Sequence, residues 1–533
     1  MHSQVRISSV VIDSVTLRPV SYASIGIPGT SRGTAANEAG VFDLIVCDNC
    51  QVKISAIGYR SKTVMDNESF PDTLLLVSSD VFLDEFTVSS ENIDAKAVVR
   101  KAFAKIKENY IRAPFKMKAF YRYTQKVDDQ YVRFSEVAFD ILKTKGYRNA
   151  PFRNQQNNRY RINEVRRSLD FSNNEITSDN YFSTVLNNDI IAFQIDQEVD
   201  HYLVDFKLSG KSSLLSGIEN YQFDLSRILY NDDEKIYKIS ISRQTPASGN
   251  YEGFIYIVAE SLAIVQFEAK LIPTYQHNYN YRRRVLVKYR KTAQGYTLFF
   301  VKSNLDVFAK NDNAFIKESR SGEILINDVV LGNDQTITKK IITDRDLFSG
   351  KYNRKFWESY TVLKSNPTEL AVIRDLSRKK NLEAQFVEKQ LYDLEAAQEA
   401  KNAEKFYRQF LIDHKKDKLC LVYWASWSDS SREHLKNMQS AIPDYQRQGI
   451  RFLFVSVDNI PKNMKKSASE FNLPHENSVR VGRFSDIFDR SFRLGLVPTY
   501  RLYHKGKLFY HGDAPPGSEE FDQQVRRLLK KAN

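Results

Sequence analysis

The cysteines are the residues of this chain best suited to covalent chemistry. Cys47 and Cys50 form a CxxC pair, a spacing found in thiol–disulfide exchange and in half of a zinc site. A zinc site needs a second pair, and Cys420 is the one other cysteine, so we expect no metal here. A redox pair normally begins a helix, whereas Asp48-Asn49 is typical of the centre of a β-turn. We therefore expect either a disulfide that closes a hairpin or two idle thiols, rather than catalysis. A disulfide would agree with an oxidising compartment.

Two serines three residues apart stand where a helix is expected to begin. The apolar run 419–424 predicts a buried strand, and the polar cluster after it predicts a helix start. Ser430 and Glu433 fit a capping box, which would explain both without catalysis. Ser428 and Ser431 have the spacing of a dithiol site, but a serine hydroxyl is a far weaker acid than a thiol and forms no disulfide. The sequence therefore predicts no thiol–disulfide exchange at this turn.

Two neighbouring residues offer other chemistry. His434 lies close enough in sequence for a Ser–His nucleophile, yet no Asp or oxyanion-hole signature accompanies it. Cys420 lies within the predicted strand, where we expect it to be buried. We assign no catalytic residues and no cofactor.

The residues Tyr423-Trp424-Ala425-Ser426-Trp427-Ser428-x-x-Ser431-Arg432 resemble the strand–active site–helix unit of thioredoxin-like proteins. The similarity is greatest to the TlpA-like thiol reductases of bacterial envelopes, which carry Trp-Cys-x-x-Cys-Arg here. Ser428 and Ser431 stand at the two cysteine positions. The resemblance implies a thioredoxin-like fold without the thiol–disulfide exchange that is usual for the family.

The elements after this turn follow the order of that family. We expect a strand at 419–424, helix 431–446, strand 451–458, helices near 462–471 and 486–492, strand 499–504, a hairpin at 505–507, a further strand and a last helix at 519–531. Leu496-Val497-Pro498-Thr499 falls where the family has a cis-proline loop, which exposes backbone groups that can pair with an extended peptide. The resemblance thus implies a degenerate active site that binds peptide, formed by Trp427, Ser428, Ser431, Val497 and Pro498.

The first 90 residues read as a series of short strands. The segments Pro19-Val20-x-Tyr22-Ala23-Ser24-Ile25, Asn37-Glu38-x-Gly40-x-Phe42 and Ile54-Ser55-Ala56-Ile57-Gly58-Tyr59 closely resemble the carboxypeptidase-regulatory-like domain. The family implies a prealbumin-like β-sandwich without catalytic residues. Such modules are common in TonB-dependent transporters and other envelope proteins of Gram-negative bacteria, which indicates an extracytoplasmic location by analogy.

The central region has the pattern of an antiparallel meander. Helical spacing over 93–110 is followed by a β-rich stretch, 115–342, that we interpret as a large curved sheet or half-barrel. The run 120–123 should pair with 131–134 across Asp128-Asp129. We expect 145–163 to be an exposed loop and 232–234 a turn rather than a metal site. The strip 275–282 is either ligand-facing or the exposed face of a strand, and we favour the latter.

A helical linker is expected between the sheet and the thioredoxin-like part. Asn366-Pro367-Thr368-Glu369 is a strong helix start, and 382–414 has the composition of a solvated helix. The fold class is therefore multidomain α+β, with an N-terminal β-sandwich, a central antiparallel β-rich domain and a C-terminal α/β thioredoxin-like fold. We place these at 1–90, 91–345 and 415–533, with the linker at 346–414.

Composition narrows the function. The net charge of +13 is spread through the chain and no nucleic-acid-binding signature accompanies it, so we expect a solvated surface and no nucleic acid. No apolar run could span a membrane and no signal peptide is visible, so the chain is either cytosolic or a mature form. We expect a non-catalytic protein of the periplasm or outer-membrane surface that binds a peptide or protein partner. Two alternatives stay open: a TlpA-like oxidoreductase using Cys47 and Cys50, and an accessory component of an outer-membrane transport or assembly complex.

Overall fold

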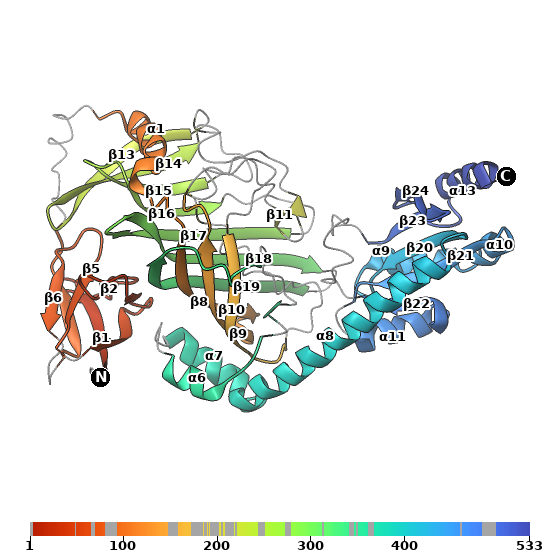
Figure 1. Cartoon of the computed structure of the whole chain (residues 1–533), viewed down its shortest axis with the longest axis horizontal. Helices are drawn as coiled ribbons and strands as arrows, with labels where there is room; N and C mark the ends of the chain where they lie inside the picture. The colour runs from red at the N-terminus through yellow and green to blue at the C-terminus, as the bar shows by residue number, and fades with distance from the viewer. Residues whose placement is uncertain are drawn as a thin grey trace.

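The chain folds into several β-sheets joined by helices, as the computed structural model shows (Figure 1). The structure describes residues 4–47, 49–65, 70–79, 93–147, 158–171, 185, 189, 191, 202–203, 206–207, 218, 221–243, 251–271, 279–311, 314–339, 346–347, 350–360, 367–458, 461–481 and 497–532. Among the described helices, none is both long and apolar enough to cross a bilayer.

The N-terminal module consists of two small sheets. Their strand orders are β4-β1-β7 and β3-β2-β5-β6. Alternating residues of both sheets, such as Val11, Ile25, Phe42 and Ile54, are wholly buried between them, as expected for a sandwich. The strands are β1 (Gln4–Asp13), β2 (Ser24–Gly26), β3 (Gly33–Ala35), β4 (Val41–Cys47), β5 (Gln51–Ser55), β6 (Lys62–Met65) and β7 (Thr73–Leu76).

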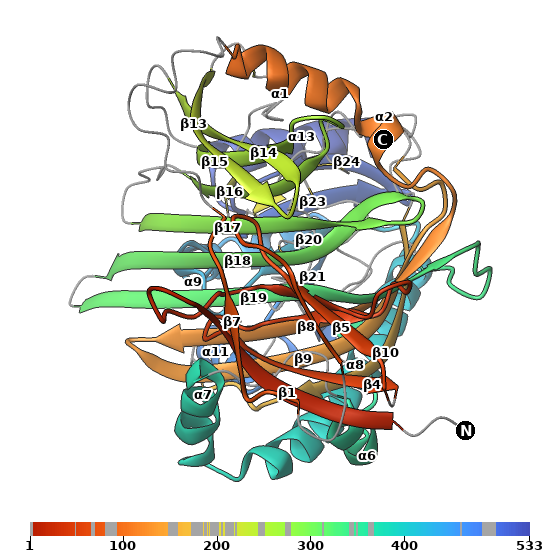
Figure 2. The same ribbon diagram turned by 90° about the vertical axis from the view of Figure 1, so that its left-hand side faces the viewer.

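The central region is one ten-stranded antiparallel sheet, in the order β10-β9-β8-β19-β18-β17-β16-β15-β14-β13 (Figure 2). Its strands are β8 (Phe115–Val127), β9 (Gln130–Lys143), β10 (Asn158–Arg167), β13 (Tyr221–Asn231), β14 (Glu234–Arg243), β15 (Tyr251–Val258), β16 (Ile264–Leu271), β17 (Tyr279–Thr292), β18 (Gly295–Asn311) and β19 (Ala314–Leu331). The helices α1 (Ala95–Ala104) and α2 (Ile106–Asn109) pack on one face of the sheet, and a separate two-stranded ribbon comprises β11 (Tyr202–Leu203) and β12 (Phe206–Lys207).

The hairpin predicted across Asp128-Asp129 is present, but its expected register was wrong, because residues 120–123 pair with 135–138 and not with 131–134. Val127 pairs with Gln130, and both aspartates have positive φ, as a two-residue turn that matches strand twist requires. The turn predicted at 232–234 is also present, between β13 and β14, with Asp232 at a φ of 54°.

The exposed loop predicted at 145–163, in the central region, was wrong in part. Residues 158–163, expected within an exposed loop, begin β10 and pair with β9. Their polar side chains find partners across the strands: Arg161 contacts the Asp140 carboxylate at 2.6 Å. Of the strip 275–282, residues 275–278 lie outside the described residues and the rest opens β17.

The face of the central sheet that carries Phe120 and Phe300, called here the sandwich face, packs against the N-terminal module. Tyr22 of the module stacks on Phe300 with ring centroids 4.9 Å apart. Its carbonyl accepts a hydrogen bond from Lys288 Nζ at 2.8 Å. Asp232, at the tip of a sheet hairpin, accepts from the backbone N–H of Ser61. The module is thus fixed to the sheet by apolar and polar contacts.

A row of alternating charges crosses five strands of the sandwich face. We call it the charge ladder: Arg166, Glu136, Arg122, Glu323 and Lys302, which are direct cross-strand neighbours in this order. Arg122 Nε lies 2.7 Å from Glu136 Oε1, and Glu136, wholly buried, also pairs with Arg166. The ladder continues into the N-terminal module, because Lys302 Nζ lies 3.0 Å from the Glu38 carboxylate.

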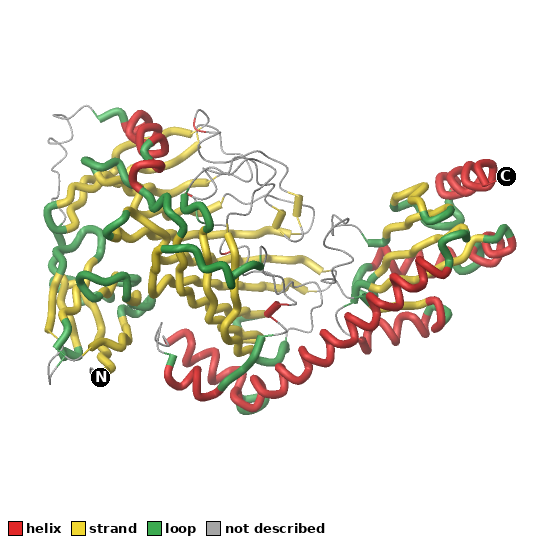
Figure 3. The backbone as a smooth tube through the Cα atoms, viewed as in Figure 1, coloured by secondary structure: helices red, strands yellow, loops and turns green. Residues whose placement is uncertain are grey.

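Three helices follow the sheet: α6 (Arg354–Ser359), α7 (Pro367–Ser377) and α8 (Leu382–Asp413). The helix start at Pro367 and the long helix from 382 are confirmed, while Asn366 lies outside the described residues. Figure 3 shows α8 as the long helix that runs from the central sheet to the C-terminal module.

The C-terminal module is a five-stranded sheet with the order β22-β21-β20-β23-β24. Its elements are β20 (Lys418–Trp424), α9 (Asp429–Met438), α10 (Ile442–Arg447), β21 (Ile450–Ser456), α11 (Pro461–Glu470), β22 (Ser478–Arg480), β23 (Thr499–His504), β24 (Lys507–Gly512) and α13 (Glu519–Ala532). The helix expected at 431–446 is two helices, because α9 ends at Met438 and α10 begins at Ile442 with Pro443 in its first turn. The helix expected at 486–492 lies outside the described residues.

Candidate functional site

The candidate site lies where the buried strand β20 ends. Leu419 to Ala425 are buried between neighbouring strands and helices, whereas Trp427 is partly exposed. β20 and β21 run parallel, so the carboxyl ends of both strands meet at the same edge of the sheet. In open sheets of this kind ligands bind at that edge.

Ser428 begins helix α9. Its extended backbone makes it the N-cap, and its Oγ accepts a hydrogen bond from the Ser431 N–H at 3.2 Å. The same hydroxyl donates to the Val497 carbonyl at 3.1 Å. The prediction that Ser430 is the cap was wrong, because the helix begins two residues before the expected start, at Asp429.

Ser431 points into the protein. It is wholly buried, and its Oγ accepts a hydrogen bond from the Ala425 N–H at 3.3 Å. This bond ties the first turn of α9 to the end of β20. The hydroxyl stabilises the turn and is not presented to solvent.

A cis peptide bond joins Val497 to Pro498, as the resemblance implied. The Val497 carbonyl accepts the hydrogen bond from Ser428, and the Val497 and Trp427 side chains pack on the same apolar cluster. The structure therefore brings together all five residues expected at this site, Trp427, Ser428, Ser431, Val497 and Pro498.

A buried carboxylate beside the turn was missed from the sequence. Asp458 Oδ1 accepts from both the N–H and the hydroxyl of Ser426, at 2.8 and 2.7 Å, and Oδ2 accepts from Ser456 at 2.6 Å. Burial raises the pKa of Asp458, although these hydrogen bonds oppose the rise. The signal in the sequence was Ser456-Val457-Asp458, polar residues that end a parallel strand.

Arg480 links the backbone of Asp458 to helix α8. Its guanidinium donates to the Asp458 carbonyl at 3.4 Å and pairs with Glu399 of α8 at 2.5 Å. Asp458, Arg480 and Glu399 thus connect the turn at Ser426 to helix α8.

Two other residues with reactive side chains, His434 and Cys420, make contacts within the C-terminal module. His434 Nδ1 is 3.1 Å from the Tyr500 hydroxyl, and burial lowers the pKa of the imidazole. Cys420 is wholly buried within β20, and burial raises the pKa of its thiol, which disfavours the reactive thiolate. Within the described residues, no cluster of His, Cys, Asp and Glu could hold a metal ion.

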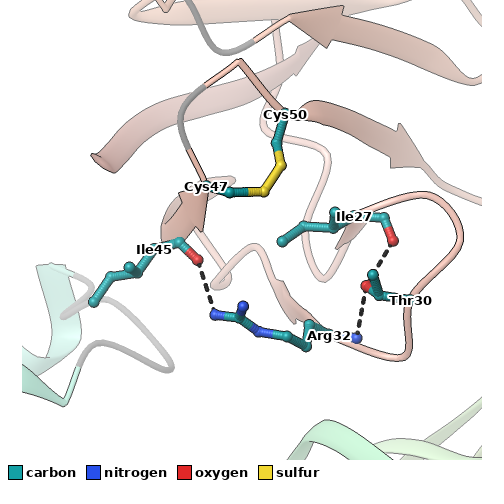
Figure 4. The surroundings of a disulfide bond; sticks show 6 residues. All are labelled: Ile27, Thr30, Arg32, Ile45, Cys47 and Cys50. Carbon is teal, nitrogen blue, oxygen red and sulfur yellow. Dashed lines mark hydrogen bonds between the residues drawn. A yellow bond between two sulfur atoms is a disulfide. The ribbon is translucent and has the colours of Figure 1, made fainter. Parts of the chain in front are cut away.

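Cys47 and Cys50 are joined by a disulfide between β4 and β5 (Figure 4). Their Cα atoms are 5.4 Å apart, and the Cys50 N–H donates to the Cys47 carbonyl, so the pair closes a β-turn. Asn49 takes the positive φ that such a turn needs. β4 and β5 lie in different sheets, so the disulfide closes a turn between the sheets and not the hairpin that was expected. This position provides no helix N-terminus to stabilise a thiolate.

Comparison with known proteins gives a family for one part of the chain. Residues 7–88 match the family model described as the CarboxypepD_reg-like domain. No curated protein matches the chain.

Similar solved structures cover about a fifth of the chain. They include a secreted disulfide oxidoreductase of Mycobacterium tuberculosis (13% identity, 21% of this chain and 81% of that chain, TM-score 0.18). The thioredoxin domain of a thiol-disulfide oxidoreductase from Bacteroides vulgatus is 16% identical over 22% of this chain and 84% of that chain, with a TM-score of 0.19. A thiol-disulfide oxidoreductase from Bacteroides fragilis is 20% identical over 21% of this chain and 81% of that chain, also with a TM-score of 0.19. The chain thus carries an N-terminal CarboxypepD_reg-like domain and has thioredoxin-like structural neighbours, while its central sheet has no assigned family.

Proposed function

We propose that this protein is a non-catalytic, extracytoplasmic envelope protein that binds an extended segment of a protein partner at the turn 426–431 and at Val497-Pro498. The observation that carries the proposal is the hydroxyl of Ser428. It caps α9 and bonds to the Val497 carbonyl, where thiol chemistry would need a free thiolate. Ser431 is buried and bonded to Ala425, so no second nucleophile stands beside it.

The surroundings support a binding role. Trp427 is partly exposed beside the cis-proline loop, and exposed aromatic side chains are common anchors in protein recognition. The Asp458 network fixes the backbone on the other side of the turn. The Cys47–Cys50 disulfide supports an oxidising, extracytoplasmic location.

The test of binding is capture from envelope extracts of the source organism with the full chain as bait. We expect a partner that is retained by the wild type and by Gln523→Ala, an exposed position on α13, but lost with Trp427→Ala. A partner set that Trp427→Ala leaves unchanged would contradict binding at this turn.

The test of non-catalysis is an insulin-reduction assay with dithiothreitol as the electron source. We expect no turnover above the rate of dithiothreitol alone. Turnover that Cys47→Ser abolishes would replace the proposal with the oxidoreductase alternative.

A further inference from the structure

Helix α8 carries aliphatic side chains on the face that is turned away from its contacts with the rest of the molecule. Phe386 and Asp393 pack toward α7 and the central sheet, and Tyr407 packs on the C-terminal module. A helix turns about 100° per residue, so the residues on the far side of these three should be polar. Several of them are instead large and aliphatic, with 48%, 59%, 46% and 65% of the residue exposed: Val387, Leu391, Leu394 and Ile412.

These four residues lie on one regular row, called here the α8 seam. Its positions are 387, 391, 394, 398, 401, 405, 408 and 412, which alternate steps of four and three residues, the spacing of the contact positions in a coiled coil. The helix contains neither Gly nor Pro, and kinks arise mostly at such residues, so the seam runs along one uninterrupted helix (Figure 3). Single exposed aliphatic residues are ordinary, whereas a row of them at this spacing indicates a second helix packed along the seam.

The charges along α8 indicate the direction of that second helix. In the first half of the helix, exposed Glu388 and Glu395 flank the seam, and in the second half the seam itself holds exposed Lys401, Lys405 and Arg408. A parallel copy of the same helix would place each of these cations against its own equivalent, which is unfavourable. An antiparallel copy places the basic half of one helix along the acidic half of the other. The helix is therefore complementary in charge to its own antiparallel copy.

One antiparallel register matches the seam along its whole length. It places opposite each other the following residues of the two copies: Val387 and Ile412, Leu391 and Arg408, Leu394 and Lys405. Long basic side chains lay their aliphatic stems along apolar surface and extend their charge beyond it. In this register the stem of Lys405 covers Leu394 of the other copy, and its ammonium group reaches Glu395, the next residue along that helix.

We propose that two copies of this chain associate through an antiparallel pair of α8 helices, with the α8 seam as the interface. The two-fold axis of such a dimer makes every contact occur twice. Four aliphatic side chains per copy form a small interface, so the dimer dissociates at micromolar concentrations. The turn 426–431 lies outside the seam, and so the dimer stands or falls independently of the binding proposed at that turn.

Sedimentation equilibrium of the full chain, over about 1 to 100 μM, measures the association. We expect a dimer whose dissociation constant rises at least about tenfold in Leu391→Ser, because each dimer loses two buried leucines. Leu370→Ser is the matched control, since Leu370 lies on α7 and is 62% exposed, against 59% for Leu391. Both positions are exposed, and the melting temperature checks that both variants fold. A wild type that stays monomeric throughout, or equal effects of the two substitutions, would overturn the proposal.

Cross-linking measures the orientation of the two helices. Val387→Cys and Ile412→Cys chains are purified separately and oxidised with glutathione disulfide, so that two protein thiols form one disulfide and the oxidant becomes two glutathione thiols. Cys420 is buried and Cys47–Cys50 is closed, which keeps the background low. We expect covalent dimers from the mixture and few from either variant alone, because equivalent ends of antiparallel helices lie about 38 Å apart. Covalent dimers from Val387→Cys alone, in the yield of the mixture, would refute the antiparallel arrangement.

A charge exchange tests the pairing within the seam. We expect Lys405→Glu to weaken the dimer at least about tenfold, because the new carboxylate lies beside Glu395 of the other copy. The double variant Glu395→Lys/Lys405→Glu restores the opposite charges and should recover most of the wild-type affinity. A double variant as weak as Lys405→Glu alone would contradict this register.

Discussion

At the scale of single residues, the hydroxyl of Ser428 has two roles. It caps helix α9, and it donates a hydrogen bond to the Val497 carbonyl. Both hydrogen bonds of Ser428 depend on its hydroxyl, so the residue contributes to local stability. This role can be measured.

We expect Ser428→Ala to lower the free energy of unfolding by about 1 kcal/mol, the usual loss when an N-cap is removed. Ser430→Ala, an exposed position in the same turn, is the matched control and should change stability by less than about 0.5 kcal/mol. Urea unfolding of both variants measures the difference. Equal losses would show that Ser428 does not cap the helix in solution.

Glu136 is the most buried member of the charge ladder. Burial alone would raise its pKa, but Arg166 and Arg122 hold the pKa below its ordinary value. Glu136→Gln leaves the buried Arg122 and the partly buried Arg166 short of a partner and should cost about 3–5 kcal/mol. Glu358→Gln, which removes an exposed charge paired with Arg354, should cost less than about 1 kcal/mol in the same denaturation experiment. Similar costs for the two variants would contradict the ladder as described.

Lys288 gives the interface between sandwich and sheet a pH dependence. Burial lowers its pKa from 10.5 to about 8, while Glu268 opposes the shift. Because the folded value lies below the unfolded one, the unfolded chain binds more protons between these values, and stability rises with pH across this window. The free energy of unfolding of the wild type, relative to Lys288→Met, should increase from pH 8 to 10. Lys291→Met, at an exposed position of the same strand, should show no such difference.

At the scale of elements, the residue pattern predicted the turns and helices that depend on interactions between residues close in sequence. The hairpin at Asp128-Asp129, the helix start at Pro367 and the long helix from Leu382 follow from turn chemistry and helical spacing, and all three are present. The strand at 158–163 could not be predicted in this way. Its arginines are favourable there because Asp140 and its neighbours lie on the adjacent strand, a tertiary effect that a local pattern does not contain.

At the candidate site, too, local pattern predicted some residues, while others depend on contacts between distant parts of the chain. Motif spacing identified Ser428, Ser431 and the cis-proline loop, while Asp458 was missed because Ser426, its partner in the turn, is 32 positions away in sequence. The cap was misplaced by two residues because Ser428 and Ser430 have the same propensity. The bond from Ser428 to Val497, a long-range contact, distinguishes them in the structure.

The disulfide closes the turn between β4 and β5, which lie in different sheets of the N-terminal module, and should act on that module alone. A cross-link that closes so short a loop contributes about 2 kcal/mol in the chain-entropy model. We expect the double variant Cys47→Ser/Cys50→Ser to lose no more than about this amount and to leave amide exchange of the C-terminal module unchanged. Increased exchange near Ser426 would instead indicate that the disulfide communicates with the candidate site.

At the scale of the whole molecule, the N-terminal module and the C-terminal module are attached to the central sheet by different means. The sandwich rests on a broad face through Tyr22, Phe300 and the charge ladder. The C-terminal module is held through α8. Sequence alone predicted the separate parts, but the attachments depend on buried pairs between residues more than 200 positions apart, such as Arg167 and Asp393.

The charge ladder also constrains how this chain can diverge. Each glutamate in the row lies between two cations on adjacent strands, so replacing any one member leaves the charges of its neighbours unbalanced. A tolerated change therefore has to be accompanied by a second change on the adjoining strand. Relatives of this chain should therefore either retain the whole row or exchange it as a block for apolar residues, and an intermediate with half a row should be rare.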